Sequence, residues 1–339
     1  MKLFLAAVMS AAVMCGGCSG NSLGHLPKRE SVWNTLEEGE EDAAAANSSS
    51  NATSEFREIN FILFSSDGNS SIGVDNAPAL LDDATFNRSL RTVFFIHGYM
   101  DSKDSDSSKT VSSAFLRQGS FNVIVVDWSA YSGFPYLSAL SNLPGASRAV
   151  ADALNRMVQT GLPAESIWLT GHSLGAQLIG VASDTITFQI HQITGMDPAG
   201  PGFETPGVAR LTRDAAELVE IVHTDAGVFG FNAPCGDVDI WPNGGTAVQP
   251  GCFLELEIGC SHLRSWMYFA EAVNHADAFP AVRCASWDDF RRGACPANGG
   301  DVVYMAHSHP GQNQTGNFYL TTNRASPFGK GQQGVTINA

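Results

Sequence analysis

Basic side chains are scarce in this chain. Only 19 of its 339 residues are Lys or Arg, against 34 Asp and Glu, and the formal net charge is −15. No basic stripe interrupts this acidic balance, so the composition argues against nucleic acid as a partner and against simple electrostatic docking on anionic membranes. Contact with a lipid surface would therefore rest on apolar groups.

The N-terminus carries an apolar run that is too short to span a bilayer. Leu3 to Met14 follows Lys2 and precedes the small residues Gly16 and Gly17, whereas a membrane-spanning helix takes about 20 apolar residues. This pattern is typical of a cleaved secretory signal. Residues 1–18 are therefore predicted to be a signal peptide, and the protein to be secreted.

Apolar residues are few in the next segment, from 19 to 55. Seven acidic residues outnumber Lys28 and Arg29 there, and so polar a segment cannot bury enough surface to fold. We expect a disordered leader at 19–55, a folded domain at 56–327 and a C-terminal tail at 328–339.

The domain alternates apolar strands with helix-like segments, which predicts an α/β fold with a mostly parallel sheet and helices on both faces. Strands are predicted at Phe61–Phe64, Thr92–Ile96, Val123–Val126, Ile167–Thr170, Ile190–Met196 and Leu218–Val222. Helices are predicted at Ser147–Val158, Ala176–Ile186 and Leu263–Ala272.

One pentapeptide, Gly171-His-Ser-Leu-Gly175, joins a predicted strand to a predicted helix. A sharp glycine turn at such a junction is a nucleophile elbow, which lifts a serine hydroxyl out of the backbone. The glycines are needed because side chains there would collide with the neighbouring strand and helix. Ser173 is therefore the candidate nucleophile.

A serine hydroxyl attacks only when a base removes its proton and an acid orients that base. In the α/β-hydrolase order both partners follow the serine. Asp127 precedes Ser173 and is interpreted as structural, whereas Asp197 ends the predicted strand Ile190–Met196 and suits the acid.

Among the nine histidines, His262 suits the base because it lies at the start of a predicted helix, with Ser261 as a candidate N-cap. His223 is interpreted as a structural residue. A third requirement is a pair of N–H donors for the oxyanion. We assign them to the backbone of Tyr99, in the turn after Thr92–Ile96, and of Leu174, while His97 is expected to support that turn.

Together these segments resemble the pancreatic lipase family, and most of all the secreted single-domain lipases and phospholipases A1 of insects. The resemblance covers about Phe56 to Pro327 and implies a triad of Ser173, Asp197 and His262. Its motifs are Phe95-Ile-His-Gly-Tyr99, Gly171-His-Ser-Leu-Gly175, Asp197-Pro-Ala-Gly-Pro201, Ile221-Val-His-Thr-Asp225, Trp241-Pro-Asn-Gly-Gly245, Gln249-Pro-Gly-Cys252 and Cys260-Ser-His-Leu-Arg264.

The resemblance also implies disulfides between Cys252 and Cys260 and between Cys284 and Cys295, which leaves Cys235 without an assigned partner. Oxidised cysteines are expected in a secreted protein. The first disulfide would enclose the lid of the family, which here has only the seven residues 253–259. Its apolar side chains, the candidates for lipid contact, are Phe253, Leu254, Leu256 and Ile258.

In the family, a short lid and a short second loop go with access for bulky phospholipid headgroups. The second loop, between His223 and Trp241, is also short here, so the resemblance implies a phospholipase A1. The alternative is a triacylglycerol lipase with the same triad, and an alternative of another class is an inactive lipid carrier or yolk-type protein. Of the family's calcium ligands only Arg210 and Asp214 stand in register, so no metal is predicted. No cofactor is expected, and because the chain stops at Ala339, no colipase.

Overall fold

The computed structural model describes residues 55–66, 68–253, 259–295, 302–307 and 314–336. Contacts within the chain divide it into Met1–Ala46 and Asn47–Ala339, and every described residue belongs to the second unit. The predicted signal peptide lies outside the described residues, as does the predicted leader up to residue 54. No helix within the described ranges has both the length and the hydropathy of a membrane span.

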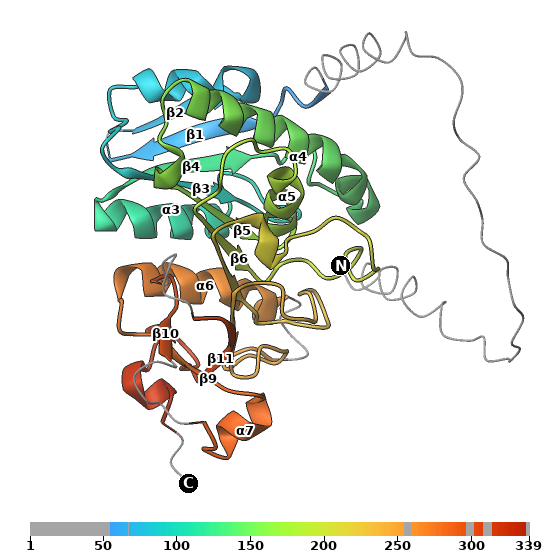
Figure 1. The fold of residues 1–339 in the computed structure, drawn as a ribbon, viewed down its shortest axis with the longest axis vertical. Helices are drawn as coiled ribbons and strands as arrows, with labels where there is room; N and C mark the ends of the chain where they lie inside the picture. The colour runs from blue at the N-terminus through green and yellow to red at the C-terminus, as the bar shows by residue number, and fades with distance from the viewer. Residues whose placement is uncertain (1–54, 67, 254–258, 296–301, 308–313, 337–339) are drawn as a thin grey trace, which may run out of the picture. The chain divides into compact units, whose positions relative to one another are not determined.

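One sheet runs through the described residues in the order β10-β9-β11-β8-β7-β6-β5-β3-β4-β1-β2 (Figure 1). All pairs from β4 through β3, β5, β6, β7 and β8 to β11 are parallel, while the pairs at the two ends are antiparallel. The strands are β1 Asn60–Ser65, β2 Gly68–Gly73, β3 Arg91–Ile96, β4 Phe121–Asp127, β5 Ile167–His172, β6 Gln192–Met196, β7 Leu218–Val222, β8 Val238–Pro242, β9 Pro280–Arg283, β10 Val302–Tyr304 and β11 Gly316–Leu320.

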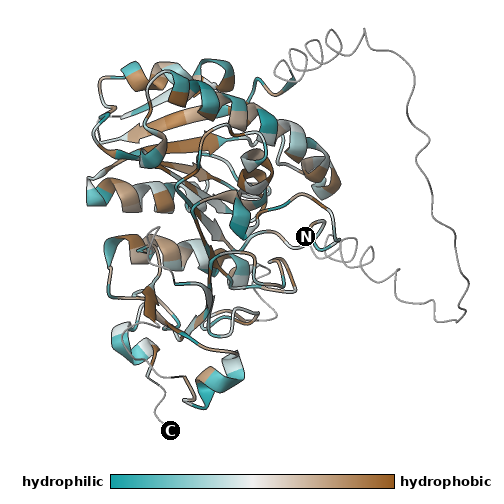
Figure 2. Cartoon of the chain, in the orientation of Figure 1, coloured by the Kyte–Doolittle hydropathy of each residue, from teal (hydrophilic) through white to brown (hydrophobic). Residues whose placement is uncertain are grey.

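Helices cover both faces of this sheet because its strands are apolar on both sides (Figure 2). In β3, Phe94 and Ile96 belong to the core cluster that also contains residues of α4 and α5, whereas Val93 and Phe95 belong to the cluster that contains residues of α3 and α6. The helices are α3 Asp106–Gln118, α4 Tyr136–Gln159, α5 Leu174–Ser183, α6 Cys260–Asn274 and α7 Trp287–Arg291, with 3₁₀ turns η1 Val74–Asp82, η2 Ala164–Ser166, η3 Arg213–Ala215 and η4 Gly331–Gly334. The predicted fold class is confirmed.

The six strands predicted from sequence are present as β1 and β3 to β7, with small shifts at their ends. Strands β2 and β8 to β11 were not predicted. The sequence of β2, Gly-Asn-Ser-Ser-Ile-Gly, has little strand propensity, and β8 contains Asp239 and ends at Pro242. Strand β2 pairs with β1, and β8 pairs with both β7 and β11, and this pairing overrides the local preferences.

The helix predictions are right in kind but wrong at several boundaries. Helix α4 begins at Tyr136 rather than Ser147 and continues through Pro144, because its earlier turns bury Ala139 and Leu143 in the core. Helix α3 was missed, since its sequence is rich in Ser and also contains Asp, Thr and Val, all of low helix propensity. The predicted cap at Ser261 is wrong: α6 begins at Cys260, after Gly259.

The parallel core of the sheet determines where the functional segments meet. Strand β5 lies between β3 and β6, and β7 is next to β6. Since parallel strands end at the same edge of a sheet, the segments that follow β3, β5, β6 and β7 gather there. These segments contain Tyr99, Ser173, Asp197 and Asp225.

Close packing of α5 gives a test of this arrangement. A Cβ atom at Gly180 would lie 2.2 Å from both Cα and N of Leu211. In a helix exposed to solvent, Gly→Ala raises stability by up to about 1 kcal/mol. Here we expect Gly180→Ala to lower the free energy of unfolding by about 1–3 kcal/mol or more, as overpacking does, in urea denaturation of the purified protein.

Ser141→Ala is the matched control, since Ser141 is an exposed residue within α4. This substitution should change stability by only a few tenths of a kcal/mol. A Gly180→Ala variant as stable as the parent would show that α5 does not pack this closely.

Candidate active site

Ser173 lies in a strained turn between β5 and α5. Its backbone has φ 55° and ψ −121°, a conformation that costs a non-glycine residue about 1–3 kcal/mol. Hydrogen bonds hold it there: its N–H donates to the carbonyl of Met196, and its carbonyl accepts from Ala176 and Ala199. The elbow predicted from sequence is present, with Ser173 at its tip.

The two glycines of the elbow are required by their neighbours. A Cβ atom at Gly175 would lie 2.1 Å from the carbonyl oxygen of Ile96, at the end of β3, and one at Gly171 would lie 2.7 Å from the backbone N of Ala176. Both distances are too short for any side chain. Strand and helix therefore approach as closely as the elbow hypothesis demands.

The structure brings the candidate acid and base together. Nδ1 of His262 donates to Oδ2 of Asp197 over 2.6 Å. The other carboxylate oxygen, Oδ1, accepts the N–H groups of Thr224 at 2.8 Å and Asp225 at 3.1 Å. Asp197 is fully buried, with a φ of 45°, while the side chain of His262 is 12% exposed. This geometry fixes the ring and leaves its other nitrogen for proton transfer.

The elbow and the imidazole lie close together. The rings of His172, next to the serine, and His262 are 4.6 Å apart between centroids. Among the described residues no hydrogen bond joins Ser173 Oγ to His262, and such contacts often tighten only when substrate binds. Burial, and then the charge of His262, lower the pKa of His172 well below its usual range, so this neighbour stays neutral.

The loop after β3 packs against the serine. A Cβ atom at Gly98 would lie 2.9 Å from Cβ of Ser173, so the peptide that carries the N–H of Tyr99 is near the nucleophile. Among the described residues no group accepts a hydrogen bond from the N–H of Tyr99 or of Leu174. Both N–H groups are thus free to serve as the oxyanion donors expected from sequence, which is taken up below as a proposal.

His97 supports this loop, as expected from sequence. Nε2 of its buried ring donates to Asp127 Oδ1 over 3.1 Å, Nδ1 lies 3.0 Å from the carbonyl oxygen of Gly98, and the indole N–H of Trp128 donates to the His97 carbonyl. Burial opposes ionisation of Asp127, but hydrogen bonds from His97 and Ser129 hold its pKa well below the usual range. Asp127 is thus a structural acid on the loop side.

Two groups of side chains have the composition of a metal site. Asp197, Asp225 and His262 form one, and His223, Cys235 and Asp239 form the other; in each, the candidate ligand atoms lie within 4.8 Å of one another. Imidazole–carboxylate hydrogen bonds of 2.6 and 2.8 Å already use these atoms, so we assign no metal to either.

The second of these groups is structural. His223 is fully buried and stacks on Trp241, with ring centroids 3.7 Å apart. Cys235 is a free thiol whose pKa is raised above its usual range by burial, so it is a poor nucleophile.

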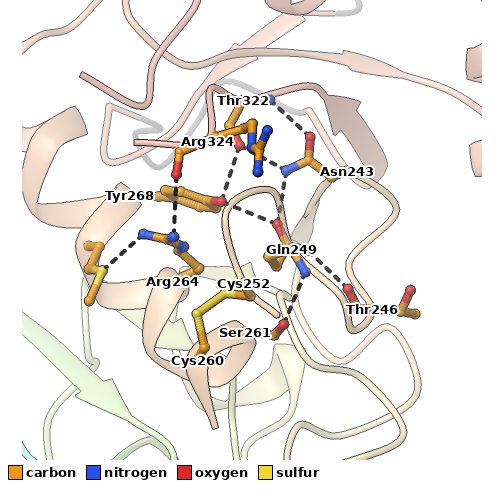
Figure 3. The surroundings of a disulfide bond; sticks show 11 residues. Asn243, Thr246, Gln249, Cys252, Cys260, Ser261, Arg264, Tyr268, Thr322 and Arg324 are labelled. Carbon is orange, nitrogen blue, oxygen red and sulfur yellow. Dashed lines mark hydrogen bonds between the residues drawn. A yellow bond between two sulfur atoms is a disulfide. The ribbon is translucent and has the colours of Figure 1, made fainter. Parts of the chain in front are cut away.

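The predicted disulfides Cys252–Cys260 and Cys284–Cys295 are both present. Figure 3 shows the first of them beside a buried network centred on Gln249. The Gln249 N–H donates to the hydroxyl of Ser261 at 3.0 Å, its amide Nε2 donates to the Pro242 and Thr246 carbonyls, and its Oε1 accepts from Asn243 and Tyr268. Ser261 thus holds the backbone of Gln249, just before the Cys252–Cys260 disulfide, rather than capping α6.

Of the predicted lid side chains, Phe253 is 55% exposed. Leu254, Leu256 and Ile258 lie outside the described residues. Arg210 and Asp214 stand in register with the calcium ligands of the family, but they have different surroundings. The Arg210 guanidinium stacks on the ring of Phe231, whereas Asp214 is exposed in η3.

One site residue was missed. Asp225 follows β7, is 2% exposed and donates its N–H to Asp197. The motif Ile221-Val-His-Thr-Asp225 was recognised in the sequence, but it gave no reason to separate Asp225 from other acids. The available signal was its position just after β7, because β6 and β7 are parallel neighbours and Asp197 follows β6.

A serine at a strained turn after a central parallel strand, with a buried carboxylate and an imidazole beside it, defines an α/β-hydrolase. A model of the lipase family matches residues 30–328, and the chain belongs to this family. The resemblance to pancreatic lipases seen in the sequence is thereby confirmed.

Three relatives show the extent of the similarity. Inactive pancreatic lipase-related protein 1 of Homo sapiens is 30% identical over 309 residues, which is 82% of this chain and 66% of the relative. Pancreatic lipase-related protein 2 of Cavia porcellus is 31% identical, over 82% and 67%. Pancreatic triacylglycerol lipase of Homo sapiens is 30% identical, over 76% and 62%. The chain spans about two thirds of the length of these relatives.

Solved structures include distant α/β-hydrolases. A putative hydrolase of this superfamily from Xanthomonas campestris has 15% identity and a TM-score of 0.33, over 46% of this chain and 75% of that one.

The close contact between Gly98 and Ser173 predicts that a larger residue at position 98 lowers the reactivity of Ser173. Gly98→Ala should push the Tyr99 peptide away from Ser173, and a displacement of about 1 Å at a reacting centre costs about 10²-fold in rate. We expect covalent labelling of Ser173 by a fluorophosphonate probe to slow by about that factor, as measured by mass spectrometry of the Ser173 peptide over time.

Gly133→Ala is the matched control, because the nearest atom to its added Cβ is the Ser129 carbonyl at 3.9 Å. It should label at the parental rate. Equal labelling of both variants would contradict the placement of the loop.

Proposed function

We propose that this protein is a serine carboxylic-ester hydrolase that acts on lipids through an acyl-enzyme. The observation that carries the proposal is the 2.6 Å bond between His262 and the buried Asp197 beside the Ser173 elbow. His262 takes the hydroxyl proton as Ser173 Oγ attacks the ester carbonyl, and Asp197 orients the ring and stabilises the imidazolium.

The developing oxyanion accepts hydrogen bonds from the N–H groups of Tyr99 and Leu174. When the tetrahedral intermediate collapses, the ester C–O bond breaks and His262 returns the proton to the leaving glycerol oxygen. A water molecule, deprotonated by the same imidazole, then hydrolyses the acyl-enzyme and releases the fatty acid and free Ser173.

Phospholipid is the substrate that the short lid favours. Cys252 and Cys260 are bridged with their Cα atoms 5.7 Å apart, and only seven residues lie between them, which leaves little chain to roof an acyl cleft or to block a bulky headgroup. The proposed activity is therefore phospholipase A1, with triacylglycerol hydrolysis by the same triad as the alternative.

A non-enzymatic lipid carrier is the candidate of another class. One relative is named an inactive lipase-related protein, so membership of the family alone does not establish activity. In this chain Ser173, Asp197 and His262 are all present and the last two are hydrogen-bonded, which favours the enzyme.

Secretion is part of the proposal. It is supported by the two disulfides and by the signal-like N-terminus, since disulfides persist in oxidising compartments.

Exposed apolar side chains near the elbow support contact with lipid. Met100 is 65% exposed, Phe134 61% and Leu137 77%. The loop after β3 lies against the segment that leads into α4: the N–H of Met100 donates to the Ser132 carbonyl at 2.9 Å, and the rings of Tyr99 and Tyr136 are 5.1 Å apart. With the net charge at −15, we propose that these apolar groups, rather than basic ones, contact the lipid surface.

The first experiment measures fatty acid release from dispersed phosphatidylcholine and from a triacylglycerol emulsion. We expect faster cleavage of the phospholipid, at the sn-1 ester, and loss of about 10⁶ in kcat for Ser173→Ala, as for other serine hydrolases. Faster triacylglycerol hydrolysis would favour the alternative substrate. Absence of serine-dependent release from both would favour the lipid carrier.

The exposed apolar side chains make a separate prediction. Phe134→Ser combined with Leu137→Ser should reduce hydrolysis of dispersed phosphatidylcholine at least about tenfold, because exposed apolar area drives adsorption to lipid. Hydrolysis of a soluble monomeric ester should stay at the parental rate, since neither side chain lies in the catalytic group. An equal loss on both substrates would contradict a role in lipid contact.

A further inference from the structure

A second buried carboxyl lies beside the Asp197–His262 pair. Asp225 is 2% exposed, and its carboxylate, that of Asp197 and the ring of His262 place one ligand atom each within 4.8 Å of one another. Asp197 follows β6 and Asp225 follows β7, so the parallel pairing of these strands brings both acids to one place.

The two carboxyl groups are held differently. Asp197 accepts three hydrogen bonds of 2.6, 2.8 and 3.1 Å. The Asp225 carboxyl accepts one long bond, 3.4 Å, from the Phe229 N–H, and among the described ion pairs no basic side chain reaches it. Solvation of its charge is therefore poor, and a buried acid in this state resists ionisation.

This geometry disfavours the ionised form of Asp225. Burial and the negative charge of Asp197 raise the pKa of Asp225 to about 6, against smaller opposing effects of His262 and the Phe229 N–H. Asp225 thus changes its charge close to neutral pH.

The groups facing Asp225 come from three elements. Asp197 follows β6, His262 lies on α6, and the Phe229 N–H belongs to its own loop. His172, at the end of β5, packs against His262 but stays neutral because its burial lowers its pKa. Asp197 and His262 are therefore the two charges to which Asp225 is coupled.

We propose that Asp225 is a positioning residue whose charge sets the pH range in which His262 is the free base. The inference rests on the proposed triad. An ionised Asp225 stabilises the imidazolium and shifts the acidic limb of the activity profile upward, because general-base catalysis needs the neutral ring. The same charge assists the imidazolium that forms in the transition state.

The test is the pH profile of kcat/KM for Asp225→Asn on a soluble neutral ester. Asn keeps the backbone N–H that bonds Asp197 and an oxygen that can accept from Phe229. The midpoint of the acidic limb should move down by about 0.5–1.5 pH units, since a unit charge a few ångströms away is removed, and the plateau should fall. A structural role alone would lower the plateau and leave the midpoint in place.

Two controls keep the outcome decisive. Asp214→Asn removes an exposed carboxylate in η3 and should leave the midpoint unchanged, whereas Asp225→Glu retains the charge and should retain the limb. If Asp225→Asn does not fold, a folded neutral variant such as Asp225→Ser takes its place. An unshifted midpoint of the acidic limb in that variant overturns the proposal. A lower midpoint in Asp225→Glu, which keeps the charge, also overturns it.

A second measurement separates this inference from the proposed function. The imidazole of His262 is titrated by NMR in Ser173→Ala, with and without Asp225→Asn. Removal of the Asp225 charge should lower the titration midpoint of His262, whether or not the protein hydrolyses esters. No change in this midpoint would overturn the role of Asp225, while ester hydrolysis that survives Ser173→Ala would overturn the proposed function alone.

Discussion

Parallel pairing of β3, β5, β6 and β7 is the constraint on which the candidate site depends. Each of these strands ends at the same edge of the sheet, so the segments that follow them converge without any long connection. Ser173, Asp197, Asp225 and the Tyr99 peptide all occupy such segments. Only His262 comes from elsewhere: it lies in the first turn of α6, which begins at the disulfide-bonded Cys260.

Close backbone packing preserves the conformations that this convergence imposes. Ser173 and Asp197 both have positive φ, which side chains disfavour. Small residues around them leave no room to relax: a Cβ at Gly175 would strike the end of β3, and one at Gly230 would lie 2.5 Å from Oδ1 of Asp197. The strained turns at Ser173 and Asp197 thus persist because the surrounding backbone leaves them no room to relax.

Burial also decides how charge behaves in the site. Asp197 and Asp225 are both excluded from water, yet one has three hydrogen-bond donors and the other a single long one. Two aspartates a few ångströms apart therefore differ in how well their charge is stabilised, and this difference cannot be read from the number of acidic residues. The exposed apolar side chains of Met100, Phe134 and Leu137 are the groups proposed for contact with lipid.

Local patterns in the sequence determined the strand core, the Ser173 elbow and the choice of Asp197, because a strand, a glycine turn and a strand end are features of neighbouring residues. The family resemblance, rather than a local pattern, gave the pairing of His262 with Asp197 across 65 residues. The passage of α4 through Pro144 and the role of Ser261 beside Gln249 could not be read from local patterns. Tertiary structure alone decided them, and the burial of Asp225, since packing between distant segments outweighs local propensity.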